Sequence, residues 1–395
     1  MKKLDIAAKI PILSWCKNLE EEALNQAINL ANHPTTVGFV ALMPDCHTGY
    51  GMPIGGVIAC KNAIIPNAVG VDIGCGMCAV QTNILIEDIN KEHLRSILQK
   101  IKLRIPMGEG NAHRTLQKWS GLYRMLAMKM DAKTFELAQK NLGTLGGGNH
   151  FIEIQKSDNG FIWLMLHSGS RNLGYQIAQY HHNIALDLNK KWHSNTSCDD
   201  LAFLPTNSDY GKGYLNDMDY ALNYAKENRV RMMRVVKECV MEVMKQVSFA
   251  TEVNIHHNYA SLENHLGQNL WIHRKGATSA KKGQLGIIPG AMGSYSYIVE
   301  GLGNPSSFQS CSHGAGRTMS RTKASETLDK EKCEEQMKDI VWDGFKKRKK
   351  RKDGTPKYDL SEAPNAYKNI NEVIEAQKDL VKILVKLETL AVLKG

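Results

Sequence analysis

Carboxylate, thiol and imidazole side chains recur in this sequence next to short apolar or glycine-rich segments. Asp72 and Cys75 stand three residues apart among glycines, which let the backbone turn sharply and leave room for a ligand. His150, His167 and His257 each follow a strand-like approach. This donor set suits Zn²⁺, Mn²⁺, Fe²⁺ or Co²⁺ better than Mg²⁺ or Ca²⁺. We therefore expect a divalent-metal site, and with two ions the thiolate of Cys75 could bridge them.

Each of these residues also has a simpler interpretation. A single histidine at a strand end is more often a hydrogen-bonded core or surface residue than a ligand. Cys75 and Cys78 could form a redox or zinc CxxC pair, although the sequence has no second CxxC for a zinc ribbon. His256 and His257 are adjacent, so they point to different sides of an extended strand and only one is expected to face a metal.

A second group of residues could act on phosphate. His313 stands beside Gly314, Gly316 and Arg317. A neutral imidazole can attack phosphorus, and a guanidinium offers a planar fork of donors to phosphate oxygens. The glycine-rich turn at 288–294 could cradle a nucleotide. Taken alone, either turn is more often structural, because neither matches a Walker A motif or a dinucleotide fingerprint.

The elements that must position these residues follow from periodicity and from the distribution of glycine and proline. Apolar runs predict strands at 37–43 and 161–166, and the segment from 45 to 80 suits short strands joined by tight turns. Helical spacing predicts helices at 19–32, about 87–103, about 114–142 and from 168–170 through 188. It also predicts a helix or a helical pair at 214–247 and a C-terminal helical face from Ile370 to Val385. The candidate residues are interleaved from 45 to 317 without a linker, which predicts one α+β domain over residues 1–395 with one site.

Composition narrows the class of protein. The formal net charge is +10 and the isoelectric point is near 9.0, which favours a polyanionic partner. The first twenty residues lack the apolar run typical of a signal peptide, and the sequence has no apolar run of membrane-spanning length, so we expect a soluble cytoplasmic protein without a membrane partner. The nine cysteines are expected to be reduced thiols. The basic run from Lys346 to Lys352 reads as a solvated loop or as a contact for an RNA backbone.

Taken together, the glycine- and histidine-bearing motifs resemble the RtcB family of RNA-splicing ligases. The motifs span nearly the whole chain in the family's order: Pro44 to Gly51, Gly70 to Met77, Leu145 to Glu153, Leu166 to Gly174, His256 to Tyr259, Arg274 to Ala277, Ile288 to Gly293, Ser312 to Arg321, and Leu393 to Gly395.

The resemblance implies a large domain of mixed β-sheets flanked by helices, with a central metal and nucleotide cleft. It further implies two Mn²⁺ ions held by Asp72, Cys75, His150, His167 and His257, with Cys75 bridging. His313 would be the nucleophile that takes GMP from GTP. Asn149, Glu153, Ser296, Tyr367 and Lys394 would surround the guanylate, with Arg171, Lys275 and Arg317 as phosphate contacts.

The activity implied by the family joins an RNA 3′-phosphate or 2′,3′-cyclic phosphate end to a 5′-hydroxyl end, in RNA repair or tRNA splicing. An archease-type activator is a candidate partner. Two alternatives stay open: a metal-dependent RNA-end phosphoesterase that forms no guanylate, and a basic RNA-binding protein without activity. The sequence departs from the family at Ala291, where many members carry a hydroxyl residue, so one nucleotide hydrogen bond is either missing or supplied by Ser294.

Overall fold

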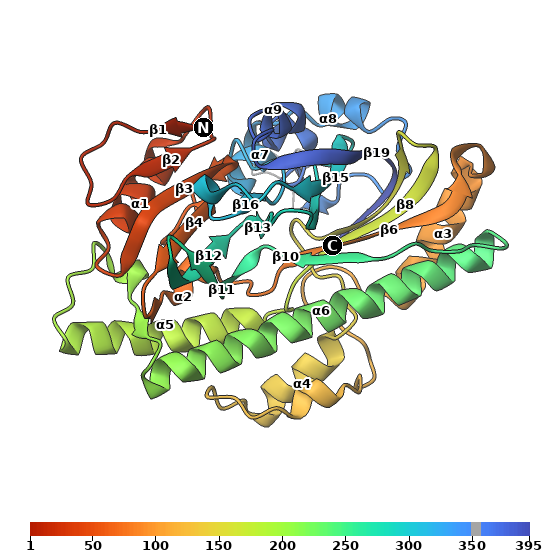
Figure 1. Cartoon of the computed structure of the whole chain (residues 1–395). Coiled ribbons are helices and arrows are strands. Elements are labelled where there is room, and N and C mark those ends of the chain that lie inside the picture. The colour runs from red at the N-terminus through yellow and green to blue at the C-terminus, as the bar shows by residue number, and fades with distance from the viewer. Residues whose placement is uncertain (349–356) are drawn as a thin grey trace.

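Two β-sheets form the centre of the molecule. The computed structural model describes residues 1–348 and 357–395 (Figure 1). A seven-stranded antiparallel sheet has the order β10 (Val253–His256), β6 (Gly76–Leu85), β8 (Phe161–Ser168), β7 (Phe151–Ser157), β19 (Val381–Lys394), β15 (Tyr295–Gly301), β14 (Leu285–Ile288). A six-stranded sheet has the order β1 (Lys2–Lys3), β2 (Ile12–Ser14), β3 (Thr36–His47), β4 (Ile54–Cys60), β12 (Gln268–Lys275), β11 (Asn258–His265), with only β2 and β3 parallel.

The two sheets are joined at His257. Strand β10 of the seven-stranded sheet ends at His256, and strand β11 of the six-stranded sheet begins at Asn258. The described residues form three further two-stranded ladders: β13 (Ala277–Ser279) with β16 (Ser310–Ser312), β17 (Lys347–Arg348) with β18 (Lys357–Tyr358), and β5 (Ala63–Ile64) with β9 (Leu204–Pro205). The chain therefore passes from one sheet to the other through a candidate metal ligand.

Helices lie along the outside of the sheets. The longest is α6 (Asp209–Val243), which begins at the cap Ser208, whose hydroxyl accepts a hydrogen bond from the Gly211 amide. Its apolar side packs with α3 (Lys91–Arg104) on strands β6, β7 and β8, and α5 (Leu173–Lys191) runs beside it (Figure 1). The other helices are short: α1 (Glu21–Asn32), α2 (Pro66–Val69), α4 (Ala132–Asn141), α7 (Arg321–Thr327), α8 (Lys330–Gln336) and α9 (Ile370–Glu375).

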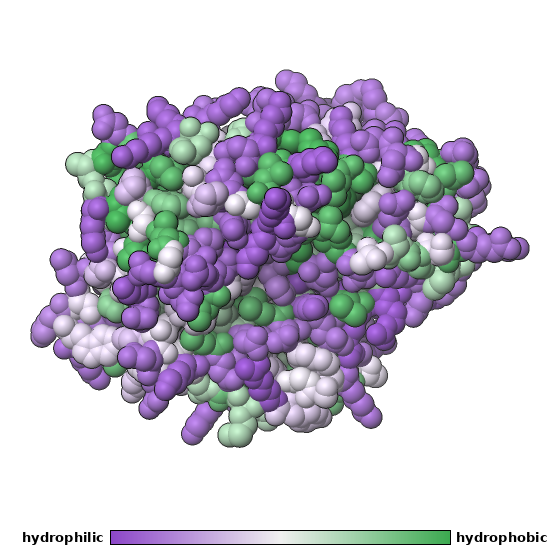
Figure 2. Space-filling model, viewed as in Figure 1, coloured by the Kyte–Doolittle hydropathy of each residue, from purple (hydrophilic) through white to green (hydrophobic). Residues whose placement is uncertain are grey.

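One face of the molecule is largely hydrophilic (Figure 2). Figure 2 shows hydrophilic residues over much of one face, with hydrophobic residues in separate groups between them. In the part of the chain that the structure describes, every helix is too short or too polar to cross a lipid bilayer. Of the basic run at 346–352, Lys346 and Lys347 are exposed, and residues 349–352 lie outside the described residues.

The fold confirms the α+β class and most of the expected elements, including the helices at 19–32 and 214–247 and the strand that ends near His167. The expected C-terminal helical face from Ile370 to Val385 is right only at its start, in helix α9 (Ile370–Glu375), and is wrong from Val381 onward. Helix α9 ends at Glu375, and Val381–Lys394 is strand β19, which lies between β7 and β15. Val381, Leu384 and Val385 fit a helical spacing, but pairing with β15 and β7 satisfies the backbone of this segment as a strand.

The helix expected at 114–142 is also mostly wrong. Only Ala132–Asn141 is α-helical, and the preceding residues form a loop with one 3-10 turn at Ser120–Tyr123. Asp131 caps the helix by accepting a hydrogen bond from the Thr134 amide. An N-cap aspartate and the Ser120-Gly121 pair are the local signals that separate the loop from the helix.

Candidate metal and nucleotide site

Sheet register brings four candidate ligands to one edge of the seven-stranded sheet. Cys75 directly precedes β6, and His150 directly precedes β7. Met77 of β6 and Phe151 of β7 are both paired with His167 of β8. On the other side of β6, Gly76 is paired with His256, so His257 follows at the same level. Neighbouring strands run antiparallel, and therefore residues distant in sequence meet at this edge.

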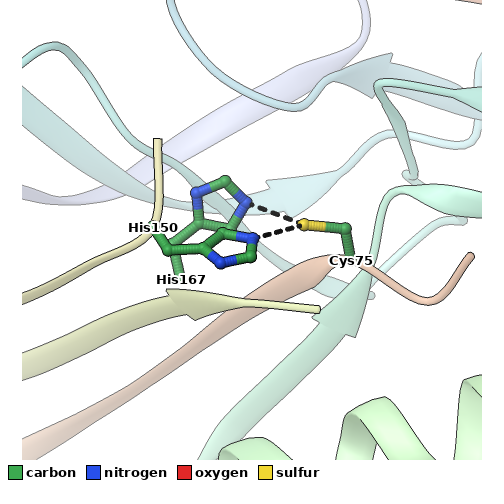
Figure 3. Close-up of side chains that lie close together, drawn as sticks. All are labelled: Cys75, His150 and His167. Carbon is green, nitrogen blue, oxygen red and sulfur yellow. Dashed lines mark hydrogen bonds between the residues drawn. The ribbon is translucent and has the colours of Figure 1, made fainter. Parts of the chain in front are cut away.

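The five candidate ligands form a continuous chain of contacts. Oδ2 of Asp72 lies 3.5 Å from Nε2 of His150, which lies 3.5 Å from Sγ of Cys75. The same sulfur lies 3.3 Å from Nε2 of His167, and that nitrogen lies 3.4 Å from Nε2 of His257. Figure 3 shows the imidazoles of His150 and His167 each directing a nitrogen toward the sulfur. Cys75 is therefore in the middle, with one pair of ligands on each side.

This arrangement fits divalent metal ions. Cys75, His150 and His167 are buried and their donor atoms are mutually within reach of one ion. Burial lowers the pKa of His167 and of His257 well below the usual value, so both imidazoles are neutral as metal ligands must be. Burial raises the pKa of the Cys75 thiol well above its usual range, and a bound cation would favour the thiolate.

Hydrogen bonds set the ring orientations. Nδ1 of His150 lies 2.9 Å from the Leu145 carbonyl, and Nδ1 of His167 lies 3.2 Å from the Asn149 carbonyl. A protonated Nδ1 that donates to a carbonyl leaves the lone pair on Nε2, which faces the cluster. His256 turns away, because its Nδ1 lies 3.0 Å from the Gly74 carbonyl. Only His257 of the adjacent pair faces the other ligands, as the alternation along a strand predicts.

His313 lies beside this cluster. It follows β16, and its ring centroid is 4.8 Å from that of His257. Nδ1 of His313 is 2.7 Å from Oδ2 of Asp45, although the angle is not that of a regular hydrogen bond. The backbone amide of His313 donates to the same oxygen over 3.2 Å. Asp45 is fully buried, so its carboxylate fixes both the backbone and the ring of His313.

A pocket opens between His313 and the seven-stranded sheet. His313 lines it, together with four of the five residues expected around the guanylate: Asn149, Glu153, Tyr367 and Lys394. Ser296 lies directly behind the pocket wall, where its hydroxyl accepts hydrogen bonds from Gln155 Nε2 (3.2 Å) and from the Gly290 amide (3.3 Å). Arg317 stacks over the Tyr367 ring at 4.8 Å and donates to the Tyr367 hydroxyl over 3.0 Å.

Two oppositely charged side chains line the pocket, Glu153, which is buried, and Lys394, which is partly exposed. Burial raises the pKa of Glu153 to about 7, with Lys394 acting in the opposite direction. Burial lowers the pKa of Lys394, while Glu362 and Glu153 act to raise it. Gln155 Nε2 donates to Glu153 over 2.7 Å. The pocket therefore offers one buried acceptor, Glu153, and one partly exposed donor, Lys394.

Arg171 and Lys275, like Arg317, are not among the residues that line this pocket. Arg171 donates from Nε to the Thr144 hydroxyl over 3.0 Å and lies near Asp72. Lys275 is buried, and its Nζ donates to the carbonyls of Tyr50 and of Asn67, the latter over 3.2 Å. Burial lowers the pKa of Lys275 to about 7. Arg171 thus stands on the metal side of the site, and Lys275 stands at the end of β12.

Comparison with known proteins matches this chain to one family over almost its full length. The family sequence model described as tRNA-splicing ligase RtcB matches residues 26–395. The chain belongs to the RtcB family. This membership confirms the resemblance that the sequence motifs indicated.

Individual RtcB proteins are similar over most of their own length. The RNA-splicing ligase RtcB of Escherichia coli (strain K12) is 39% identical over 98% of this chain and 97% of that protein. The tRNA-splicing ligase RtcB of Pyrobaculum aerophilum is 29% identical over 98% of this chain and 95% of that protein. The RNA-splicing ligase RtcB homolog 1 of Entamoeba histolytica is 33% identical over 94% of this chain and 83% of that protein.

Two residues of the site in this RtcB-family chain had no role assigned from sequence. Asp45 stands in the motif Pro44 to Gly51, but nothing local indicates that it contacts His313. Glu362 lies in the pocket wall, where its carboxylate accepts from Arg321 Nε over 2.9 Å and lies 3.7 Å from Lys394 Nζ. Glu362 also lines an adjoining cavity of about 430 Å³. No motif surrounds Glu362, so only the folded contacts reveal it.

Proposed function

We propose that this chain is a GTP- and Mn²⁺-dependent RNA ligase that joins an RNA 3′-phosphate or 2′,3′-cyclic phosphate end to a 5′-hydroxyl end. The observation that carries the proposal is the position of His313, which lies against Asp45, next to His257 of the metal-ligand cluster, and lines the pocket. Membership of the RtcB family and the names of the similar proteins support a splicing ligase.

Two ions would be held on either side of Cys75. Asp72, His150 and Cys75 are the proposed ligands on one side, and Cys75, His167 and His257 are the proposed ligands on the other. Bound Mn²⁺ would polarise phosphoryl oxygens and orient the attacking group. The mixed carboxylate, thiolate and imidazole donors favour Mn²⁺ over Mg²⁺, whose sites are built from oxygen alone.

In the first step GMP is transferred from GTP to His313. With Nδ1 held near Asp45, Nε2 carries the free lone pair and attacks the α-phosphorus of GTP. The N–P bond forms, the bond from that phosphorus to the β-phosphate oxygen breaks, and pyrophosphate leaves. Asp45 stabilises the charge that develops on the imidazole, as a buried carboxylate does beside a reacting histidine.

Two further transfers seal the RNA. An oxygen of the RNA 3′-phosphate attacks the phosphorus of the histidine-bound GMP, so the N–P bond breaks and an RNA end carrying a 3′-diphosphate-linked guanosine forms. The 5′-hydroxyl of the second strand then attacks the former 3′-phosphate, its proton is lost, and GMP leaves. A 2′,3′-cyclic end would first be opened by water to the 3′-phosphate at the same site.

The pocket residues would select and hold the guanylate. Ionised Glu153 would accept hydrogen bonds from the N1 and N2 donors of guanine, and Lys394 would donate to an acceptor on the base. Asn149, Ser296 and Tyr367 would contact the rest of the nucleotide, and Arg317, Arg171 and Lys275 would contact phosphates. An archease-type protein is the proposed activator.

Incubation with Mn²⁺ and GTP labelled at the α-phosphate tests the proposal. We expect label bound covalently to the protein, and no label on His313→Ala. His193→Ala is the matched control, because His193 is exposed. The labelled enzyme should then seal an RNA 3′-phosphate to a 5′-hydroxyl strand. Release of phosphate from RNA ends without any labelled protein would instead support a metal-dependent phosphoesterase.

A further inference from the structure

Arg229 is a fully buried cation at the middle of helix α6. Its side chain has 0% exposure. Among the described residues no carboxylate lies within ion-pair distance of its guanidinium, which donates instead to neutral groups. Burial lowers the pKa of Arg229 to about 10, although nearby acidic groups act to raise it. Burying an arginine is costly, so its contacts must be well satisfied.

The contacts of Arg229 reach three separate segments. Nη1 donates to the Gly74 carbonyl over 2.8 Å and to the Ser168 carbonyl over 3.0 Å. Nε donates to Oδ1 of Asn254 over 2.8 Å, and Nη2 lies 3.1 Å from Nδ1 of His256. Each contacted segment carries a proposed metal ligand at the adjacent position or within three residues: Cys75 follows Gly74, His167 precedes Ser168, and His257 follows His256.

Asn228, the preceding residue of α6, reaches the fourth segment. Its Oδ1 accepts from the amides of Gly143 (2.7 Å) and Thr144 (3.0 Å). Its Nδ2 donates to the Thr144 carbonyl (3.1 Å) and to the Ser168 hydroxyl (3.1 Å). That hydroxyl donates in turn to the Leu145 carbonyl over 2.8 Å, the same carbonyl that orients His150 through Nδ1.

Helix α6 also approaches the first segment closely. Gly74 has a φ of +79°, and a Cβ at this position would lie 2.9 Å from Cβ of Ala225 and 3.1 Å from the Ala221 carbonyl. Only glycine allows both this backbone conformation and this contact. The helix surface around residues 221–229 is therefore in direct contact with the backbone that leads into Cys75.

We infer that Asn228 and Arg229 are positioning residues that set the spacing of the metal ligands. Two adjacent side chains on one helix tie together the four backbone segments that carry Cys75, His150, His167 and His257. The planar fork of arginine can reach two carbonyls, an amide oxygen and an imidazole at once, whereas lysine can offer only a point charge. The inference rests on the proposed metal site. It means that helix α6, which supplies no ligand, positions the residues that do.

Metal binding by the purified protein, without GTP or RNA, tests the inference. Metal-free protein is titrated with Co²⁺ while the absorption of the thiolate-to-cobalt and d–d bands is followed. We expect Arg229→Met to retain the wild-type far-ultraviolet circular dichroism and to bind Co²⁺ about 10- to 100-fold more weakly, with altered bands. Arg231→Met is the matched control on the same helix, since Arg231 is partly exposed and pairs with Glu227.

Two gentler variants keep the test decisive if Arg229→Met does not fold. Arg229→Lys retains the buried cation without the fork, and Asn228→Ala removes only the amide. Both are expected to weaken Co²⁺ binding at least about tenfold. They should also raise the Mn²⁺ concentration for half-maximal labelling, with labelling at saturating Mn²⁺ close to that of the wild type. Wild-type affinity and bands in the folded variants would overturn the inference. Absence of Co²⁺ binding by the wild type would instead overturn the proposed metal site, and with it the inference.

Discussion

Oδ2 of Asp45 lies 2.7 Å from Nδ1 of His313, although the two residues are 268 positions apart in the chain. Asp45 belongs to β3 of the six-stranded sheet, and His313 follows the small ladder of β13 and β16. Among the described residues Oδ1 of Asp45 has no hydrogen-bond partner, whereas Oδ2 lies near both the backbone amide and the ring of His313. A fixed ring with a free Nε2 is the state that attack on phosphorus requires.

Asp45→Asn should therefore slow the formation of the labelled GMP adduct. An amide cannot stabilise the developing positive charge, and one of its orientations presents an N–H to the ring. We expect a loss of roughly 100- to 10,000-fold in the rate at saturating Mn²⁺ and GTP. The rate is measured by quenched-flow labelling, with circular dichroism to verify folding. A rate within twofold of the wild type would show that Asp45 has only a structural role.

Replacing single ligands should distinguish the two proposed metal sites. Asp72→Asn alters only the side that contains His150, and His257→Ala alters only the side that contains His167. Each variant is expected to retain about half of the bound Mn²⁺, whereas Cys75→Ala should lose both ions because the sulfur contacts both sides. Metal content after dialysis, measured by inductively coupled plasma mass spectrometry, checks this. Equal losses in all three variants would contradict the bridging position of Cys75.

The sequence indicated the grouping of the candidate metal ligands but not several of the elements around them. The donor types of Cys75, His150 and His167 and the glycines beside them are local signals, and the structure brings these residues together. The roles of Asp45, Glu362 and Arg229 depend on contacts between distant segments, and no spacing in the sequence encodes those contacts. Long-range pairing also determines the secondary structure near the C-terminus. Val381–Lys394 is a strand because it pairs with β7 and β15, despite its helical spacing.

The buried carboxyl of Glu153 predicts a pH dependence of GTP use. Burial raises its pKa to about 7, so below that pH the group is protonated and cannot accept from both guanine donors. The apparent KM for GTP should rise about tenfold per pH unit below pH 7, because the ionised fraction falls tenfold per unit. Labelling rates measured at several GTP concentrations from pH 5.5 to 8.5 check this. Glu153→Gln should bind GTP more weakly, with a KM that does not change with pH in this range.

The shifted pKa of Glu153 should also make the stability of the protein fall as the pH rises. Because the pKa in the folded protein is above the ordinary value of 4.5, the folded state holds a proton that the unfolded state releases between the two values. Its contribution to the free energy of unfolding is fully present below pH 4.5 and is lost as the pH rises through about 7. The free energy of unfolding, measured by urea unfolding at several pH values, should therefore change with pH differently in the wild type and in Glu153→Gln across this window. Identical changes with pH would mean that Glu153 is already ionised in the folded protein.

Ala291 and Ser294 predict an increase in nucleotide affinity by a single substitution. Ala291 lines the pocket, and the hydroxyl of Ser294 donates to the Ala291 carbonyl over 2.8 Å, so it is directed into the turn rather than toward a ligand. Ala291→Ser would place a hydroxyl on the pocket wall. A net hydrogen bond of about 0.5 to 1.5 kcal/mol corresponds to a decrease of roughly 2- to 13-fold in the KM for GTP. Ser294→Ala is the control. It should leave that KM nearly unchanged and lower the melting temperature of the protein, because the turn loses one hydrogen bond. A large increase in KM for Ser294→Ala would instead mean that Ser294 rotates to supply the nucleotide contact in the complex.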